Sequence, residues 1–189
     1  KMDLRRAVRY KPRKANAENG SKRALTKKKL GRRYKDFQKF VEEHPGQRIV
    51  EMDTVEGIKG GKVLQTFLWR ENGLMIAFLK DSKGMSGMVE SLDLLEENLG
   101  LETFQELFPL ILTDNGFEFA DPELFEASLK EGRFRSSIYY CEPRQCQQKG
   151  SLEKNHEYIR YIIPKGRSFD ELTQEKVDLM MSHINSTVR

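Results

Sequence analysis

The sequence has few cysteines and lacks a long hydrophobic run. Its two cysteines cannot form a framework of disulfide bonds, so a reducing, cytoplasmic location is expected. The longest uninterrupted apolar run, residues 74–79, is far shorter than the ~20 residues of a membrane-spanning helix, and the basic start of the chain predicts no secretory signal. The three histidines stand singly, which argues against a zinc site. With 189 residues, the chain is also too short for a multidomain enzyme.

Positive charge is concentrated at the start of the chain. Residues 1–35 contain 15 of the 33 Lys and Arg residues and two acids, for a net charge of +13, whereas residues 36–189 carry −9. The basic segment has too few apolar residues to fold alone, so we expect an arm or linker that is poorly ordered without a nucleic-acid partner. A polyphosphate suits it, because each cation placed on a phosphate releases a condensed counterion. A solvated linker is the alternative interpretation.

Apolar residues in the body alternate between strand and helix periods. Short β-branched and aromatic runs between turn residues predict strands at 48–53, 62–69, 74–79, 109–113 and 134–140, the first three as antiparallel neighbours. Apolar residues at helical spacing predict helices at 34–43, 85–99, 121–132 and 152–163, and a last one from about residue 173. This order predicts an α/β fold with a mixed five-stranded sheet flanked by helices.

Three carboxylates occupy informative places in this order. Asp53 ends the first predicted strand, Asp114 ends the fourth, and Glu153 lies in the first turn of a later helix. If the two strands are neighbours, the aspartates face each other, which is unfavourable unless a cation lies between them. Mg²⁺ takes one or two carboxylates together with substrate phosphate oxygens, so the pattern suits phosphoryl transfer. Alternatively, the aspartates are turn residues and Glu153 favours the positive end of its helix.

Three sequence strings surround these carboxylates: EMDTVEG (51–57), LTDNGFEF (112–119) and QQKGSLEKNHEYIRYIIPKG (147–166). In this order they resemble bacterial insertion-sequence transposases of the IS-thirty type, which are DDE recombinases with an RNase H-like, retroviral-integrase-like catalytic domain. The resemblance implies that Asp53, Asp114 and Glu153 are the catalytic triad and the ligands of Mg²⁺, with Mn²⁺ as a substitute. Glu157, one helical turn on, is the alternative third ligand.

The same resemblance implies a function and a domain organisation. Such a transposase cleaves double-stranded DNA at the ends of its element and transfers the freed 3′-hydroxyl into target DNA, and self-association on DNA is expected. Residues 36–189 are then the catalytic domain of a longer, nucleoid-associated bacterial transposase, separated here from its N-terminal helix-turn-helix region. An RNase H-like nuclease that only hydrolyses, and a catalytically inactive DNA-binding relative, are the alternatives.

Basic and polar residues near the triad and in the arm are the candidate DNA contacts. Arg160 lies two helical turns after Glu153, where the resemblance implies a basic residue close to phosphate, and an ion pair with Glu157 or Glu153 is its alternative role. His156 is a candidate for contact with the DNA end, and its alternative role is to pack against the apolar residues of its helix. The predicted DNA contacts are Arg5, Arg6, Lys27, Lys28, Lys29, Arg32, Arg33, Lys154, Asn155, His156 and Arg160.

Overall fold

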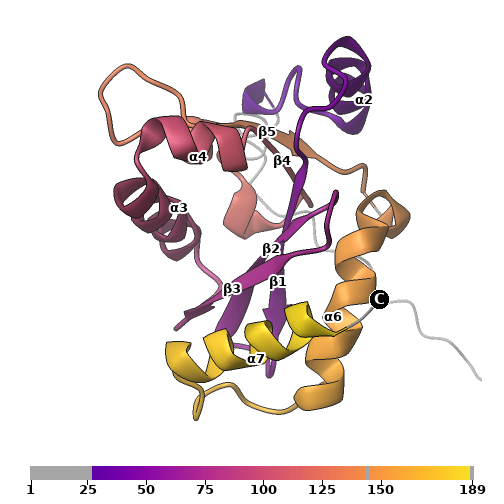
Figure 1. Cartoon of the computed structure of the whole chain (residues 1–189), viewed down its shortest axis with the longest axis vertical. Coiled ribbons are helices and arrows are strands. Elements are labelled where there is room, and N and C mark those ends of the chain that lie inside the picture. The colour runs from indigo at the N-terminus through magenta and orange to yellow at the C-terminus, as the bar shows by residue number, and fades with distance from the viewer. Residues whose placement is uncertain (1–26, 144, 188–189) are drawn as a thin grey trace, which may run out of the picture.

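The computed structural model describes residues 27–143 and 145–187. Its strands form one five-stranded sheet in the order β3-β2-β1-β4-β5, with β1 at the centre (Figure 1). β2 pairs antiparallel with β1 and β3, whereas β4 is parallel to β1, and β5 is parallel to β4. The mixed five-stranded sheet predicted from the sequence is therefore confirmed. The strands are β1 (Val50–Glu56), β2 (Val63–Trp69), β3 (Met75–Lys80), β4 (Leu110–Thr113) and β5 (Ser137–Tyr140).

Helices cover both faces of the sheet. On one face, α3, α4 and α5 enclose a core that includes Phe67, Phe104 and Ile111. On the other, α6 and α7 pack over Leu64 and Leu68, while α2 covers β4 and β5. Because both faces are covered, β2 is buried along its whole length. The helices are α2 (Tyr34–Glu43), α3 (Met85–Leu99), α4 (Leu101–Leu107), α5 (Pro122–Glu126), α6 (Gly150–Ile162) and α7 (Gln174–Ser186), with 3₁₀ turns η1 (Phe117–Phe119) and η2 (Cys146–Lys149).

The helix predicted at residues 121–132 is shorter in the structure. It begins as expected, with Asp121 as the N-cap, but α5 ends at Glu126. The chain then turns back on itself, because Ala127 forms an antiparallel bridge with Phe134 and the Ser128 N–H donates to the Arg133 carbonyl at 3.0 Å. This turn also takes the residues before 137 out of the predicted strand, so β5 is four residues long.

The segment after Gly100 forms a helix that the sequence analysis did not predict. The glycine has φ +76° and its N–H donates to the Glu96 carbonyl, which ends α3 as expected. The chain resumes at once as α4, because Leu101 and Phe104 are buried against the core. The predicted helix at 85–99 is therefore present as α3, and the additional α4 follows it at an angle (Figure 1).

Helix α7 closes the outer edge of β3 with two side-chain amides. Asn185 accepts from the Met75 N–H at 2.9 Å and donates to the Met75 carbonyl at 2.8 Å. Gln174 accepts from the Leu79 N–H at 2.8 Å and donates to the Ala77 carbonyl at 2.9 Å. The edge strand's exposed backbone groups thus find the partners that an additional strand would supply.

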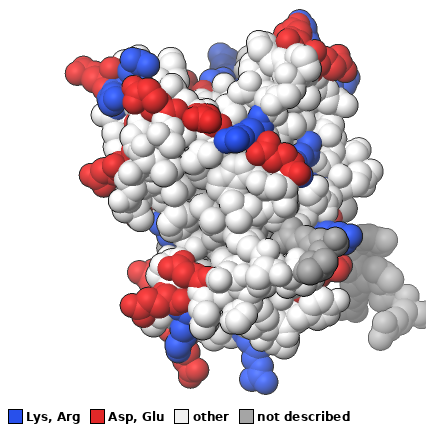
Figure 2. All heavy atoms as spheres, viewed as in Figure 1, with Lys and Arg blue, Asp and Glu red and all other residues white. Residues whose placement is uncertain are grey.

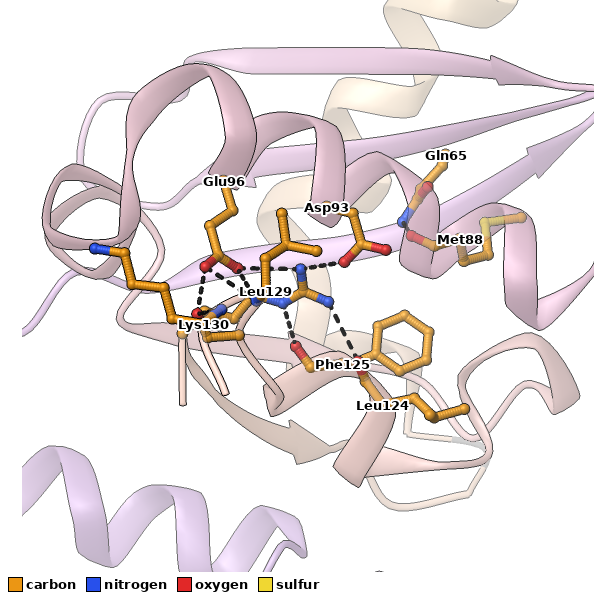
Figure 3. A network of polar contacts seen from close by, with 10 residues as sticks. Gln65, Met88, Asp93, Glu96, Leu124, Phe125, Leu129 and Lys130 are labelled. Carbon is orange, nitrogen blue, oxygen red and sulfur yellow. Dashed lines mark hydrogen bonds and ion pairs between the residues drawn. The ribbon is translucent and has the colours of Figure 1, made fainter. Parts of the chain in front are cut away.

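Arg135, a buried arginine, joins α3 to the segment around α5 and β5. Figure 3 labels its partners Asp93, Glu96, Leu124 and Phe125. The side chain of Arg135 is 1% exposed; its guanidinium lies 2.5 Å from Asp93 Oδ1 and 3.4 Å from Glu96 Oε2. It also donates to the carbonyls of Phe125 and Leu124, at 2.9 and 3.2 Å. Because every member of a buried polar network must find partners, these contacts fix how α5 lies against α3.

The surface in the view of Figure 2 mixes acidic and basic side chains around a largely uncharged middle. None of the helices within the described residues combines the length and apolar character needed to cross a bilayer.

Candidate active site

Two aspartates lie on or next to adjacent parallel strands: Asp114 directly follows β4 as predicted, whereas Asp53 lies in the middle of β1, which continues to Glu56, so the prediction that Asp53 ends its strand is wrong. Glu51 of β1 pairs with Leu112 of β4, and continuing this register by two residues places Asp53 and Asp114 at equivalent positions. Because side chains alternate along a strand, both aspartates project on the same side of the sheet as Glu51, which contacts α6. The juxtaposition on which the sequence prediction depended, neighbouring first and fourth strands, is therefore present.

Each aspartate is oriented by a backbone N–H close to it in the sequence. Asp53 Oδ1 accepts from the Thr54 N–H, and Asp114 Oδ1 accepts from the Gly116 N–H, both at 2.8 Å. A Cβ atom at position 116 would lie within 3 Å of the Glu118 carboxylate, so a larger residue there would require the Glu118 side chain to move. Both aspartates are only partly buried, which leaves them accessible from solvent.

The third predicted carboxylate reaches the same region from α6. Glu153 lies in the first turn of this helix and is exposed, while Leu152 and Ile159 on the neighbouring stripe are fully buried and fix the helix on the sheet. Asp114 and Glu153 line one pocket of about 250 Å³. The other lining residues are Asn115, Cys141, Glu142, Pro143, Gln145 and Lys149.

The donor set suits a hard cation, although the ligands are not gathered around one point. Among the described residues, no three His, Cys, Asp or Glu side chains lie close enough together to hold one metal ion. Lys149 lines the same pocket, and its Nζ lies 3.0 Å from Asp53 Oδ2. Lys149 therefore links Asp53 to the pocket that Asp114 and Glu153 line. Carboxylate oxygens are the ligands that Mg²⁺ prefers, and a positive group already lies against one of them. The chemistry of these carboxylates therefore suits a divalent ion, but among the described residues their arrangement forms no metal site.

A buried ion pair that the sequence analysis did not predict fastens α6 to β1. Glu51 is fully buried, and its carboxylate pairs with Arg70 at 2.5 Å and accepts from the Leu152 N–H at 2.7 Å. Arg70 also donates to the Gln148 carbonyl at 2.7 Å. These contacts fix the start of the helix that carries Glu153. The sequence held one signal for this ion pair: Glu51 is an acidic residue among apolar ones, two positions before Asp53 and so on the same face of the strand.

His156 lies behind Asp53 rather than in open solvent. Its Nε2 is 2.9 Å from Thr66 Oγ1, and that hydroxyl lies 3.3 Å from the Asp53 carbonyl. Burial lowers the pKa of His156 to about 4, against the opposing effect of the Asp53 charge. The imidazole is therefore neutral near pH 7. The predicted DNA contact of His156 stays a prediction, as do those of the exposed Lys154 and the buried Asn155.

Arg160 lies against the end of β1. One guanidinium nitrogen, Nη2, donates to the Glu56 carbonyl at 2.8 Å, while Nη1 is buried and has no hydrogen-bond partner. Within the described part of the chain, no ion pair joins Arg160 to Glu157 or Glu153, the alternative partners that the sequence allowed. Its predicted contact with DNA stays a prediction.

The end of the basic arm, from residue 27 onward, lies against the body. Lys28 pairs with Asp121 at 2.6 Å, and Arg32 pairs with Glu126 at 2.6 Å. Lys29 points toward the active site instead, because its Nζ donates to Asn115 Oδ1 at 3.2 Å, and burial lowers the pKa of this lysine. Of the remaining predicted arm contacts, Lys27 is exposed, Arg33 precedes α2, and Arg5 and Arg6 lie outside the described residues.

Two curated sequences are similar to part of the chain. A transposase for the insertion sequence element IS4351 of Bacteroides fragilis is 30% identical over 89 residues, covering 47% of this chain and 26% of the relative. A putative integrase, ORF3, of Spiroplasma virus SpV1-R8A2 B is 28% identical over 82 residues, covering 42% of this chain and 23% of the relative. The chain thus matches about a quarter of the length of these relatives. No protein-family model matches it.

Two solved structures share the fold. The catalytic core domain of BIV integrase has a TM-score of 0.52 at 16% identity, covering 76% of this chain and 87% of that one. A chain of the simian T-cell lymphotropic virus intasome, in complex with the PP2A regulatory subunit B56 gamma, also has a TM-score of 0.52, at 17% identity, covering 75% of this chain and 49% of that one. The RNase H-like fold implied by the sequence resemblance is confirmed, and the relatives support a catalytic domain of the transposase or integrase type.

Proposed function

We propose that this chain is the catalytic domain of a DDE transposase, which uses Mg²⁺ to cleave DNA at the ends of a mobile element and to join the freed 3′-hydroxyl to target DNA. The observation that carries the proposal is the position of Asp53 in β1 and of Asp114 directly after the adjacent parallel strand β4, with Glu153 on α6, the helix that packs against β1. This arrangement occurs in a fold shared with an integrase catalytic core. Mn²⁺ is the expected substitute for Mg²⁺.

The chemistry assigns a simple role to each carboxylate. Asp53, Asp114 and Glu153 would hold the metal, which supplies activation of the attacking oxygen and stabilisation of the leaving oxygen when it is bound. In cleavage, water attacks the phosphorus and the bond to the 3′-oxygen of the element end breaks. In joining, that 3′-hydroxyl attacks a target phosphodiester and displaces its 3′-oxygen. Neither step uses a covalent enzyme intermediate, in keeping with the buried Cys141, whose pKa burial raises to about 11.

The test of this function needs no knowledge of the terminal repeats. The protein is incubated with supercoiled plasmid and a labelled duplex that ends in a free 3′-hydroxyl, with Mg²⁺, with Mn²⁺, or with EDTA. We expect metal-dependent nicking of the plasmid and transfer of label to it, together with a rise in melting temperature in Mn²⁺ alone. Nicking without transfer would indicate a nuclease that only hydrolyses. An unchanged melting temperature and no product would contradict the proposal.

Double-stranded DNA is the proposed partner, and self-association on DNA is part of the proposal. Arg160 supports it because one of its guanidinium nitrogens has no hydrogen-bond partner and the residue lies two helical turns after Glu153 on α6. Lys29 supports it because it lies beside the turn that follows Asp114. Lys154, Asn155 and His156 are on the same helix as Glu153 and are proposed to contact the DNA end.

The arm before residue 27 is expected to supply most of the non-specific attraction to DNA. Residues 1–26 carry nine of the arm's cations and both of its acids, whereas the body is acidic. Replacing this segment with a Gly/Ser linker of equal length should weaken DNA binding at low salt. It should also flatten the dependence of log K on log salt, by about 0.9 for each lost phosphate contact. An unchanged slope in a salt titration would show that these residues are only a linker.

A further inference from the structure

The ammonium group of Lys149 is buried against the first carboxylate of the site. Lys149 ends η2, just before α6, and its side chain is 5% exposed. Its Nζ lies 3.0 Å from Asp53 Oδ2 and donates to the Met52 carbonyl at 3.3 Å. A lysine is almost never buried to this extent without a partner, so the pair with Asp53 is what makes this burial possible.

Both oxygens of Asp53 are therefore engaged. Oδ1 accepts from the Thr54 N–H, and Oδ2 pairs with Lys149, which also lines the pocket that Asp114 and Glu153 share. A divalent ion at Oδ2 and an ammonium 3.0 Å from the same oxygen would repel each other strongly in a partly buried site. One cation must leave when the other arrives.

The surroundings of Lys149 allow this movement. Its four-carbon stem is flexible, and Lys149 itself lines the pocket that Asp114 and Glu153 share. The ammonium can therefore leave Asp53 and stay in the pocket that Lys149 already lines.

We propose that Lys149 is the resident cation of the carboxylate site: it pairs with Asp53 before metal binds, and the first divalent ion must displace it from Asp53. The displacement rests on the proposed function, whereas the ion pair can be measured without metal. Lys149 is thus a positioning residue that opposes metal binding and keeps the empty site ordered.

The first experiment compares melting temperatures of Lys149→Met with and without Mn²⁺. Methionine is unbranched and of similar length, so it removes the charge with little change of shape. Without metal, we expect the variant to melt about 2–4 °C below the wild type, because Asp53 loses its partner. In saturating Mn²⁺ this deficit should disappear, and the Mn²⁺ dissociation constant should fall about tenfold because the competing cation is gone. The exposed Lys165, changed to Met, is the matched control and should alter neither quantity.

A double-mutant cycle with Asp53→Asn separates the two parts of the proposal. Without metal, the effects of Lys149→Met and Asp53→Asn should be strongly non-additive, and the double variant, which leaves no charge unpaired, should melt above Lys149→Met. Additive effects would disprove the ion pair. If Mn²⁺ stabilises the wild type but binds Lys149→Met no more tightly, the displacement is wrong while the proposed function stands. If Mn²⁺ does not stabilise the wild type, the displacement is wrong, and if the plasmid assay also gives no product, the proposed function is wrong as well.

Discussion

Asp114→Asn is expected to lower DNA cleavage and joining by about 10²–10³-fold or more while leaving the fold intact. The substitution removes one charge from the proposed metal site, where it would stabilise the transition state. It keeps the oxygen that accepts the Gly116 N–H, so the turn after β4 should hold its shape. Initial rates of plasmid nicking and strand joining in Mg²⁺, measured beside thermal melts, give the two quantities.

The control for this substitution is an aspartate with the same chemistry but no role in the site. Asp81 has a side chain that is 97% exposed, and it pairs loosely with Lys62 at 3.9 Å. Asp81→Asn should therefore leave rates, melting temperature and the response to Mn²⁺ unchanged. If Asp114→Asn joined DNA at the wild-type rate, Asp114 would not belong to the catalytic site.

Arg135→Met is expected to lower the free energy of unfolding by about 3–5 kcal/mol. The guanidinium is buried and pairs with Asp93 and Glu96, so its loss leaves Glu96, which is 3% exposed, buried with an uncompensated charge. For a chain of this size the loss corresponds to a fall of roughly 10 °C in melting temperature. Urea unfolding gives the free energy, and an unchanged m-value would show that the unfolded reference state is the same.

Two further variants separate the charge from the packing. Adding Glu96→Gln to Arg135→Met removes the unpaired charge but keeps an oxygen for the Leu129 N–H, so the double variant should recover part of the lost stability. Arg133→Met, at an exposed position in the same turn, should change the free energy of unfolding by no more than about 0.5 kcal/mol. If the single and double variants lose the same free energy of unfolding, the loss comes from the missing packing of the Arg135 side chain and not from an unpaired charge.

Local signals in the sequence were sufficient to predict the position of most strands of the sheet. The Asn72-Gly73 turn and the β-branched runs are short-range features, and the structure has β1 to β4 near the predicted positions. α4 escaped prediction because Gly100 ends one helix and precedes another, which only the burial of Leu101 and Phe104 decides. The short α5 escaped it because the competing pairing of Ala127 with Phe134 lies beyond the helical pattern.

The carboxylates of the candidate site could be chosen from the sequence, but their partners could not. Asp53 and Asp114 were recognisable because each comes at the end of a run of apolar residues in the sequence. Their partners come from distant parts of the chain. Lys149 is 96 residues from Asp53 in the sequence, and Glu51 is 101 residues from Leu152. Nothing in the local composition distinguishes Lys149 from an exposed lysine, because burial depends on where η2 meets β1.

The side-chain amides of α7 also limit how copies of this chain can assemble. An open edge strand is a template on which a second chain can add a strand, which promotes both dimerisation and aggregation. On β3, Asn185 and Gln174 already occupy the backbone groups of Met75, Ala77 and Leu79. A continuous intermolecular sheet through this edge would require α7 to detach. If copies gather on DNA as proposed, they would therefore meet through surfaces other than the β3 edge, and this edge would not start the growth of fibrils.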